Sequence, residues 1–313
     1  MRSYRILLVI LPLLTVAEIA VAQPKPSPGD SVTVTGAKSR EVMQRFVEKF
    51  SSPTSLIGKM ARWTKPICPR VLGMDPERSK FVIRRLKEVA VQIGAPVDPG
   101  TDCKANLQIV FTGKPQDFMN DTRRMHAPFL GYYDTEEQLD RLALVTHPIQ
   151  GWYTTETEDT RGRTIADDSK VMPGAEIHLP CSPGPGCYGG YKILYADAAA
   201  YAVSGNRMIG NGLRSGFRHA LIVVDADKLA KEEVGVLADY IVMLSLSQVK
   251  SLDTCQTLPS VVNLLAPNCA KPQGLLSADL GYLNGLYHMN PDLEMRGQQD
   301  YVAYQMEQSL AGR

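Results

Sequence analysis

Residues 218–249, RHALIVVDADKLAKEEVGVLADYIVMLSLSQV, decide the fold. Residues 218–225 have a continuous apolar centre, which predicts a strand buried on both faces. The segment from Glu232 to Val249 is apolar almost all round, so we expect it to form the central buried helix. Together the two segments predict a sheet packed against a helix within one hydrophobic core.

The flanking sequence adds a few strands and several helices. The strongest pattern is Asp75-Pro76-Glu77, an N-cap, a first-turn proline and a first-turn acid that open a helix ending at Gly94. Weaker patterns predict strands at 106–112 and 147–158 and an irregular stretch at 160–216. They also predict helices at 115–124 and 296–310, a helix capped by Ser39 that runs to Phe50, and a helix capped by Ser277 that runs to Tyr287. This order predicts a single α+β domain over residues 39–313, with a small mixed sheet, a central buried helix and C-terminal helices.

The first 22 residues have the pattern of a cleaved secretory signal peptide. A basic start precedes an apolar run, and Ala20-Val21-Ala22 supplies small residues at −3 and −1. An uncleaved membrane anchor is the alternative, but it needs about 20 apolar residues and Glu18 interrupts this stretch. Residues 23–38 are rich in proline and predict a flexible linker. We therefore expect an exported protein, periplasmic or extracellular, with no transmembrane anchor after cleavage.

Composition and charge exclude several classes of protein. With 44% hydrophobic and 21% charged residues, the chain is neither a disordered tail nor a coiled coil. It has 34 basic and 33 acidic residues, and the first 22 contain two basic residues and one acidic residue. The remainder is balanced at 32 of each. This balance gives no long-range attraction to nucleic acid or anionic lipid, so we expect no nucleic-acid partner.

Six cysteines lie beyond the signal peptide, and export favours disulfides over free thiols. Six cysteines allow 15 pairings, and the sequence alone cannot choose among them. Spacing favours pairing each cysteine with its neighbour along the chain. The alternative of a zinc site lacks a C-x-x-C pair. The expected bonds are Cys68–Cys103, Cys181–Cys187 and Cys255–Cys269.

No complete catalytic or metal-binding motif is present. The five histidines never stand at i, i+3 or i+4, which a zinc site on a helix needs, and the nucleophile-elbow and phosphate-loop motifs are absent. We therefore expect no cofactor and no metal. Asp239 lies within the apolar helix, as an exposed edge or as a buried structural partner. Together with His178, His219 and Asp225, it is a candidate for a site built from dispersed residues.

The sequence resembles an uncharacterised family of exported bacterial proteins through Arg62-Trp-Thr-Lys-Pro-Ile-Cys-Pro69, Leu237-Ala-Asp-Tyr-Ile-Val-Met-Leu-Ser-Leu-Ser-Gln248, Leu264-Leu, and Leu276-Ser-Ala-Asp-Leu-Gly-Tyr-Leu-Asn-Gly-Leu-Tyr287. More distantly, the order of strand, buried helix and closing helices is similar to secreted zinc peptidases of the zincin class. In those enzymes the buried helix carries His-Glu-x-x-His. Here the ligand positions hold Ala238 and Val242, and only the acid survives, as Asp239. The resemblance implies a zincin-like scaffold without its metal.

These features predict a catalytically inactive, exported binding or structural module, whose partner is an unknown protein or peptide of the cell envelope. The alternative is a peptidase-like hydrolase with a non-standard site built from the dispersed His and Asp residues. A third possibility is a purely structural module of the envelope with an exposed apolar groove.

Overall fold

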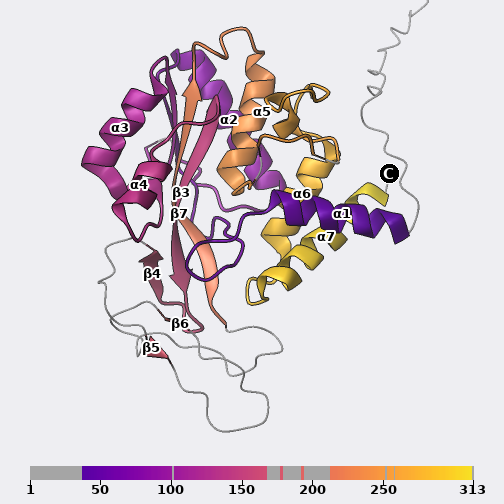
Figure 1. The fold of residues 1–313 in the computed structure, drawn as a ribbon. Helices are drawn as coiled ribbons and strands as arrows, with labels where there is room; N and C mark the ends of the chain where they lie inside the picture. The colour runs from indigo at the N-terminus through magenta and orange to yellow at the C-terminus, as the bar shows by residue number, and fades with distance from the viewer. Residues whose placement is uncertain are drawn as a thin grey trace, which may run out of the picture.

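The computed structural model describes residues 37–100, 102–167, 177–178, 192–193, 212–250, 252–256 and 258–311. The described chain is a mixed α+β structure (Figure 1). Its α-helices are α1 (Ala37–Phe50), α2 (Pro76–Gln92), α3 (Pro115–His126), α4 (Glu136–Leu142), α5 (Val234–Leu246), α6 (Ser277–His288) and α7 (Met295–Ala311). Its strands are β1 (Pro69–Leu72), β2 (Leu107–Thr112), β3 (Ile149–Glu158), β4 (Thr164–Asp167), β5 (Ile177–His178), β6 (Lys192–Ile193) and β7 (Arg214–Asp225).

One five-stranded mixed sheet organises the described chain, with the strand order β1-β2-β7-β3-β4. Strands β1, β2 and β7 are parallel, and β3 runs antiparallel to both β7 and β4. Strand β7 therefore occupies the centre, as its continuous apolar sequence predicts. Strands β5 and β6 pair separately with each other.

Helices cover the two faces of the sheet unequally. Figure 1 shows α3 and α4 on one side of the sheet and α2, α5 and α6 on the other. We call these the α3 face and the α5 face. Alternate residues of β7 point to opposite faces: Ile222 and Val224 join the core of the α5 face, and Leu221 and Val223 join a smaller core under α3.

The helix opened by Asp75-Pro76-Glu77 is confirmed as α2. The Asp75 side chain accepts a hydrogen bond from the backbone N–H of Arg78, as expected of an N-cap. The chain leaves the helix at Gly94, whose φ of +78° favours glycine. The core side of α2 buries Val82, Leu86, Val89 and Ala90.

The central helix is confirmed as α5, although it is shorter than predicted and spans Val234–Leu246. Its residues from Val236 to Leu246 are all buried, so it lies inside the core of the α5 face. A short 3-10 helix, η3 (Val261–Leu264), packs against it. No helix in the described ranges combines the length and the apolar character required to cross a bilayer.

Two of the expected disulfides are confirmed. Cys68 bonds to Cys103 across the segment that contains α2, and Cys255 bonds to Cys269 around η3. Disulfides are consistent with an exported protein. The predicted Cys181–Cys187 bond lies outside the described residues, as does the predicted signal peptide.

Several predicted boundaries and elements were wrong. Helix α1 already includes Ala37, so Ser39 does not cap it and the helix begins inside the predicted linker. Helix α6 includes Ser277, and the carboxylate of Asp279 instead accepts the backbone N–H of Leu276. The sequence patterns missed β1, β4 and α4, which have only four to seven residues each. Such short segments show too little periodicity to be recognised.

Candidate functional site

Asp239 is a buried structural partner. The residue lies on α5 and is buried, with 7% of its surface exposed. Its Oδ1 lies 2.5 Å from Nε of Arg85 on α2, and its Oδ2 accepts the backbone N–H of Leu275 at 2.9 Å. Gly274 passes so close that an added Cβ would stand 2.6 Å from Oδ2. The carboxylate thus ties α5 to α2 and to the segment before α6.

The neighbours of Asp239 along α5 do not fit a zinc ion. Ala238 and Val242 are fully buried and have no ligand atoms, whereas zinc needs nitrogen, sulfur or carboxylate ligands. Within the described ranges, no group of three or more His, Cys, Asp or Glu side chains is arranged to hold a metal ion. These two positions of α5 therefore offer no ligands to a zinc ion.

Asp225 caps the turn that follows β7. Its carboxylate accepts the backbone N–H of Lys228 at 3.1 Å and lies 3.0 Å from the ammonium of the same residue. Partial burial raises the pKa of Asp225, but the hydrogen bonds and charge of Lys228 outweigh it, so the pKa is lowered. The group stays ionised and has a structural partner.

The structure does not bring the candidate residues together. His219 is the sixth residue of β7, because the strand begins at Arg214, four residues before the predicted start at Arg218, and its ring lies on the α3 face. Asp225 lies at the far end of the same strand, about 20 Å along it at about 3.3 Å per residue. Asp239 lies across the sheet in the core of the α5 face. The side chain of His178 is outside the described part.

A cleft surrounds His219 on the α3 face. It consists of a cavity of about 460 Å³ and a neighbouring one of about 180 Å³ that share Phe129 and His219. We call the two together the His219 cleft. The larger cavity is lined by Asn106, Gln108, Phe118, Asp121, Thr122, Met125, His126, Phe129, His219, Ala220 and Leu221. The smaller is lined by Pro128, Phe129, Thr154, Thr155, Ala166, Asp167, Arg218 and His219.

Three rings form a continuous edge-to-face row at the cleft. The Phe129 centroid lies 5.9 Å from that of His126 and 5.3 Å from that of His219. Phe129 belongs to the 3-10 helix η1 (Ala127–Leu130), which places its ring over β7. Met125, on the last turn of α3, is 68% exposed beside this row. Aromatic and thioether groups left open to water are favourable contacts for another apolar or aromatic group.

His219 is a neutral imidazole at neutral pH. Burial lowers its pKa, and the nearby cations Arg218 and Lys104 lower it further, against a smaller opposite effect of Glu156. A neutral imidazole offers one hydrogen-bond donor and one acceptor. Its ring can therefore both contact an apolar group and orient a polar one.

The smaller cavity ends at a polar wall from β3 and β4. The hydroxyls of Thr155 and Thr157 donate to the two carboxylate oxygens of Asp167 at 2.7 and 2.8 Å. These bonds hold the buried carboxylate in place and use both hydroxyl protons. Among the described lining residues, no hydroxyl or thiol is hydrogen-bonded to the imidazole of His219.

The sequence analysis singled out His219 but missed the rest of the cleft. Phe129 and Met125 belong to a short segment whose sequence, Met-His-Ala-Pro-Phe-Leu, has no recognised motif. The only signal in the sequence was a methionine and a phenylalanine within three residues of His126.

Comparisons of the chain with protein-family models, with curated proteins and with solved structures found no match in any of the three.

Proposed function

We propose that this chain is an exported, non-catalytic binding protein of the cell envelope on a metallopeptidase-like scaffold. Its ligand is an apolar or aromatic side chain of a peptide or protein partner, bound in the His219 cleft. The observation that carries the proposal is the row of three rings, open to solvent beside a neutral imidazole. A cleft of several hundred Å³ that combines apolar and aromatic side chains with polar groups has the size and character of a binding pocket.

The position of Asp239 supports the non-catalytic part of the proposal. In the zincin-like alignment this residue would be the general base, but its carboxylate is engaged by Arg85 and by the backbone of Leu275. A base needs free access to the proton that it takes. The neighbouring ligand positions hold alanine and valine.

Titration with a small aromatic peptide tests the binding site. The probe is an acetylated and amidated Gly-Phe-Gly tripeptide, with Gly-Gly-Gly as the matched control. We expect the phenylalanine peptide alone to shift the imidazole NMR signals of His219 in a saturable manner. Phe129→Ala removes the central ring, so it should weaken the binding at least tenfold.

The control variant is Tyr304→Ala on α7, which removes a ring of similar exposure far from the cleft. His219→Ala should change the free energy of unfolding by about 1 kcal/mol or less, because the ring is only partly buried. Equal shifts with both tripeptides, or unchanged binding by Phe129→Ala, would contradict the proposed site.

Stoichiometric zinc in the purified, disulfide-intact protein would contradict the non-catalytic assignment. Export predicts a periplasmic or extracellular chain that begins at Gln23, as mass spectrometry can test.

A further inference from the structure

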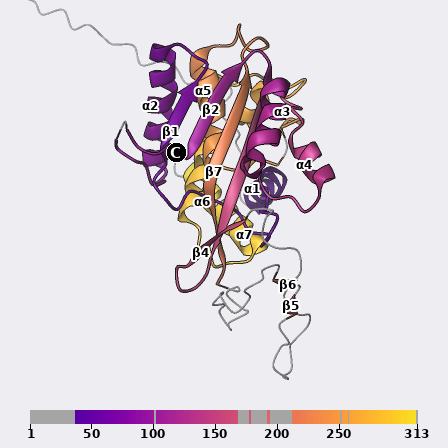
Figure 2. The same ribbon diagram turned by 90° about the vertical axis from the view of Figure 1, so that its left-hand side faces the viewer.

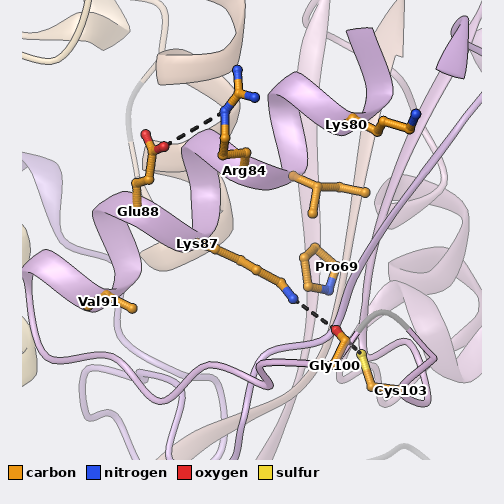
Figure 3. Close-up of a pocket in the computed structure, with 9 residues that line it drawn as sticks. Pro69, Lys80, Arg84, Lys87, Glu88, Val91, Gly100 and Cys103 are labelled. Carbon is orange, nitrogen blue, oxygen red and sulfur yellow. Dashed lines mark hydrogen bonds and ion pairs between the residues drawn. The ribbon is translucent and has the colours of Figure 1, made fainter. Parts of the chain in front are cut away.

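A second groove lies at the opposite edge of the sheet, along α2. Six residues of α2 line it at the spacing of one helix face: Lys80, Ile83, Arg84, Lys87, Glu88 and Val91. Figure 3 shows Lys80, Arg84, Lys87, Glu88 and Val91 along α2, with the ammonium of Lys87 reaching toward Gly100. Val91, at its end, is 68% exposed, which is unusual for a valine on a helix already packed into a core. This face of α2 is therefore amphipathic but not covered by the described chain.

Strand β1 and the disulfide loop form the rest of the groove. Pro69, Gly100 and Cys103 line it opposite α2, and the cavity measures about 740 Å³. The Cys68–Cys103 bond fixes the loop to the start of β1, so the groove has a covalently held end. It shares no lining residue with the His219 cleft.

The outer edge of β1, away from β2, has backbone groups at Val71 without a partner in the described chain. Strand β1 pairs only with β2 and forms the edge of the sheet. The carbonyl of Cys68 accepts from the backbone of Leu107 on β2, whereas the N–H and carbonyl of Ile67 bond outward to the segment 96–98. Because these groups alternate in direction along a strand, the N–H and carbonyl of Val71 also point outward. No described backbone group bonds to them.

Positive charge dominates the groove, with three cations against one carboxylate. Lys80 bonds to Glu77, and Arg84 lies 3.8 Å from Glu88. The ammonium of Lys87 donates only to the carbonyls of Asp98 and Gly100, and it forms no ion pair with a described carboxylate. A negatively charged ligand is thus complementary to this surface.

The spacing of the cations matches that of side chains on an extended chain. Lys80 and Arg84 are four residues apart on a helix, or about 6 Å along its axis. Alternate side chains of a strand, which point the same way, are about 6.6 Å apart. Acidic residues at alternate positions of a strand beside β1 would therefore meet successive cations of α2.

We propose that the groove between α2 and β1 binds an extended acidic segment of a partner protein, which adds to the sheet as a strand beside β1. The segment exchanges backbone hydrogen bonds with Val71. Its acidic side chains, at alternate positions, face Lys80, Arg84 and Lys87. This site is separate from the His219 cleft and does not depend on the function proposed for it.

Fluorescence anisotropy with labelled octapeptides tests the proposal on the full-length protein. The acidic probe alternates glutamate with threonine, and the matched probe alternates lysine with threonine. We expect saturable binding of the acidic peptide at least tenfold tighter than that of the basic one. The double charge reversal Lys80→Glu with Arg84→Glu should weaken binding of the acidic peptide at least tenfold. Both side chains are about two-thirds exposed, so folding should survive the change.

The control is the double reversal Lys49→Glu with Lys231→Glu, which changes the net charge equally at two exposed sites elsewhere. It should leave the affinity within twofold. Val71→Pro removes the outward N–H and should weaken binding about fivefold; proline is tolerated on the open side of an edge strand, and circular dichroism checks the fold.

Four outcomes would overturn the proposal. The first is equal affinity for both peptides, and the second is an equal loss in the control reversal. The third is binding that depends on the cations but is unchanged in the folded Val71→Pro variant, and the fourth is equally tight binding of a single-stranded oligonucleotide of the same charge. Either of the last two would assign the groove to polyanions in general.

Discussion

The two faces of the sheet differ in how many apolar residues they bury. On the α5 face, 45 buried hydrophobic residues of the described chain form one cluster, which also surrounds hydrogen-bonded carboxylates such as Asp239 and Asp279. On the α3 face the corresponding cluster has eight residues, and Phe129 and Met125 remain exposed beside it. Because burial of apolar area supplies most folding stability, the α5 face dominates the stability of the fold. The α3 face contributes less to stability, and the His219 cleft lies on it.

Figure 2 views the sheet from the α3 face. Helices α3 and α4 lie toward the β3 side and leave β1 and β2 in open view. Leu72 on β1 is accordingly 44% exposed. The contrast between the faces is therefore one of coverage, and variants placed in matched positions on both faces can test it.

The largest expected effect comes from truncating the same side chain in the two cores. Leu86→Ala on the α5 face should lower the free energy of unfolding by about 3–4 kcal/mol, because rigid neighbours surround the lost methyl groups. Leu130→Ala on the α3 face should cost about 2 kcal/mol, because the thin cluster beside the cleft relaxes more easily. Urea unfolding curves measure both values. Equal losses would remove the distinction between the two cores.

A smaller effect should separate the ion pairs of the two faces. Asp239→Asn should destabilise the protein by about 2 kcal/mol, below the range for a fully buried pair because Arg85 remains about one-third exposed. The matched variant Asp140→Asn removes the contact of Arg123 with a carboxylate that is 60% exposed on the α3 face, and it should cost less than about 0.5 kcal/mol. Thermal unfolding of both variants tests the difference. An Asp239→Asn variant as stable as Asp140→Asn would show that the buried pair is not a structural staple.

The smallest effect concerns the pH dependence of the α5 face. Burial raises the pKa of Asp279 to about 6, although hydrogen bonds from Ser260, Leu276 and Val261 act in the opposite direction. The folded protein therefore binds this proton more tightly than the unfolded chain. The stabilisation is complete below about pH 4 and is lost as the pH rises through about 6.

Asp279→Asn keeps a neutral acceptor at this position, so it should remove this part of the pH dependence. We expect the stability of the wild type relative to the variant to fall by about 1–2 kcal/mol between pH 4 and pH 7. Urea midpoints at the two pH values measure the difference. His219 should act in the opposite direction: its lowered pKa makes the folded state less stable below about pH 6.5. A constant difference between the wild type and Asp279→Asn would contradict the raised pKa.

The sequence predicted the long elements well because their signals are local. Helix α2 is specified by an N-cap, a proline and a glycine within its own segment, and β7 and α5 by their uninterrupted apolar residues. The Cys255–Cys269 pair followed from spacing, because a short loop holds its ends close together. Cys68–Cys103, with a separation of 35 residues, was the pair that remained once the more closely spaced cysteines were matched. Short strands such as β1 and β4 could not be predicted, since pairing with distant neighbours stabilises them.

The candidate sites could be predicted only in part. His219 attracted attention as a histidine on a buried strand, but its neighbours Phe129 and Thr154 come from separate elements that the sheet topology brings together. For Asp239 the sequence left exposure and burial equally open. The outcome depended on Arg85, which lies 154 residues earlier in the chain.

The sequence by itself determined the class of fold, the central strand and helix and the cap of α2, and it favoured the two disulfide bonds that the structure shows. Each of these depends on the periodicity, capping or spacing of residues near one another in the chain. Only the tertiary structure decided that Asp239 bonds to Arg85 and Leu275 and that His219 lies in a row of three rings. It also decided that β1 forms an edge of the sheet beside three cations. These features arise from contacts between distant segments, and their energies depend on burial and direction, which no local pattern encodes.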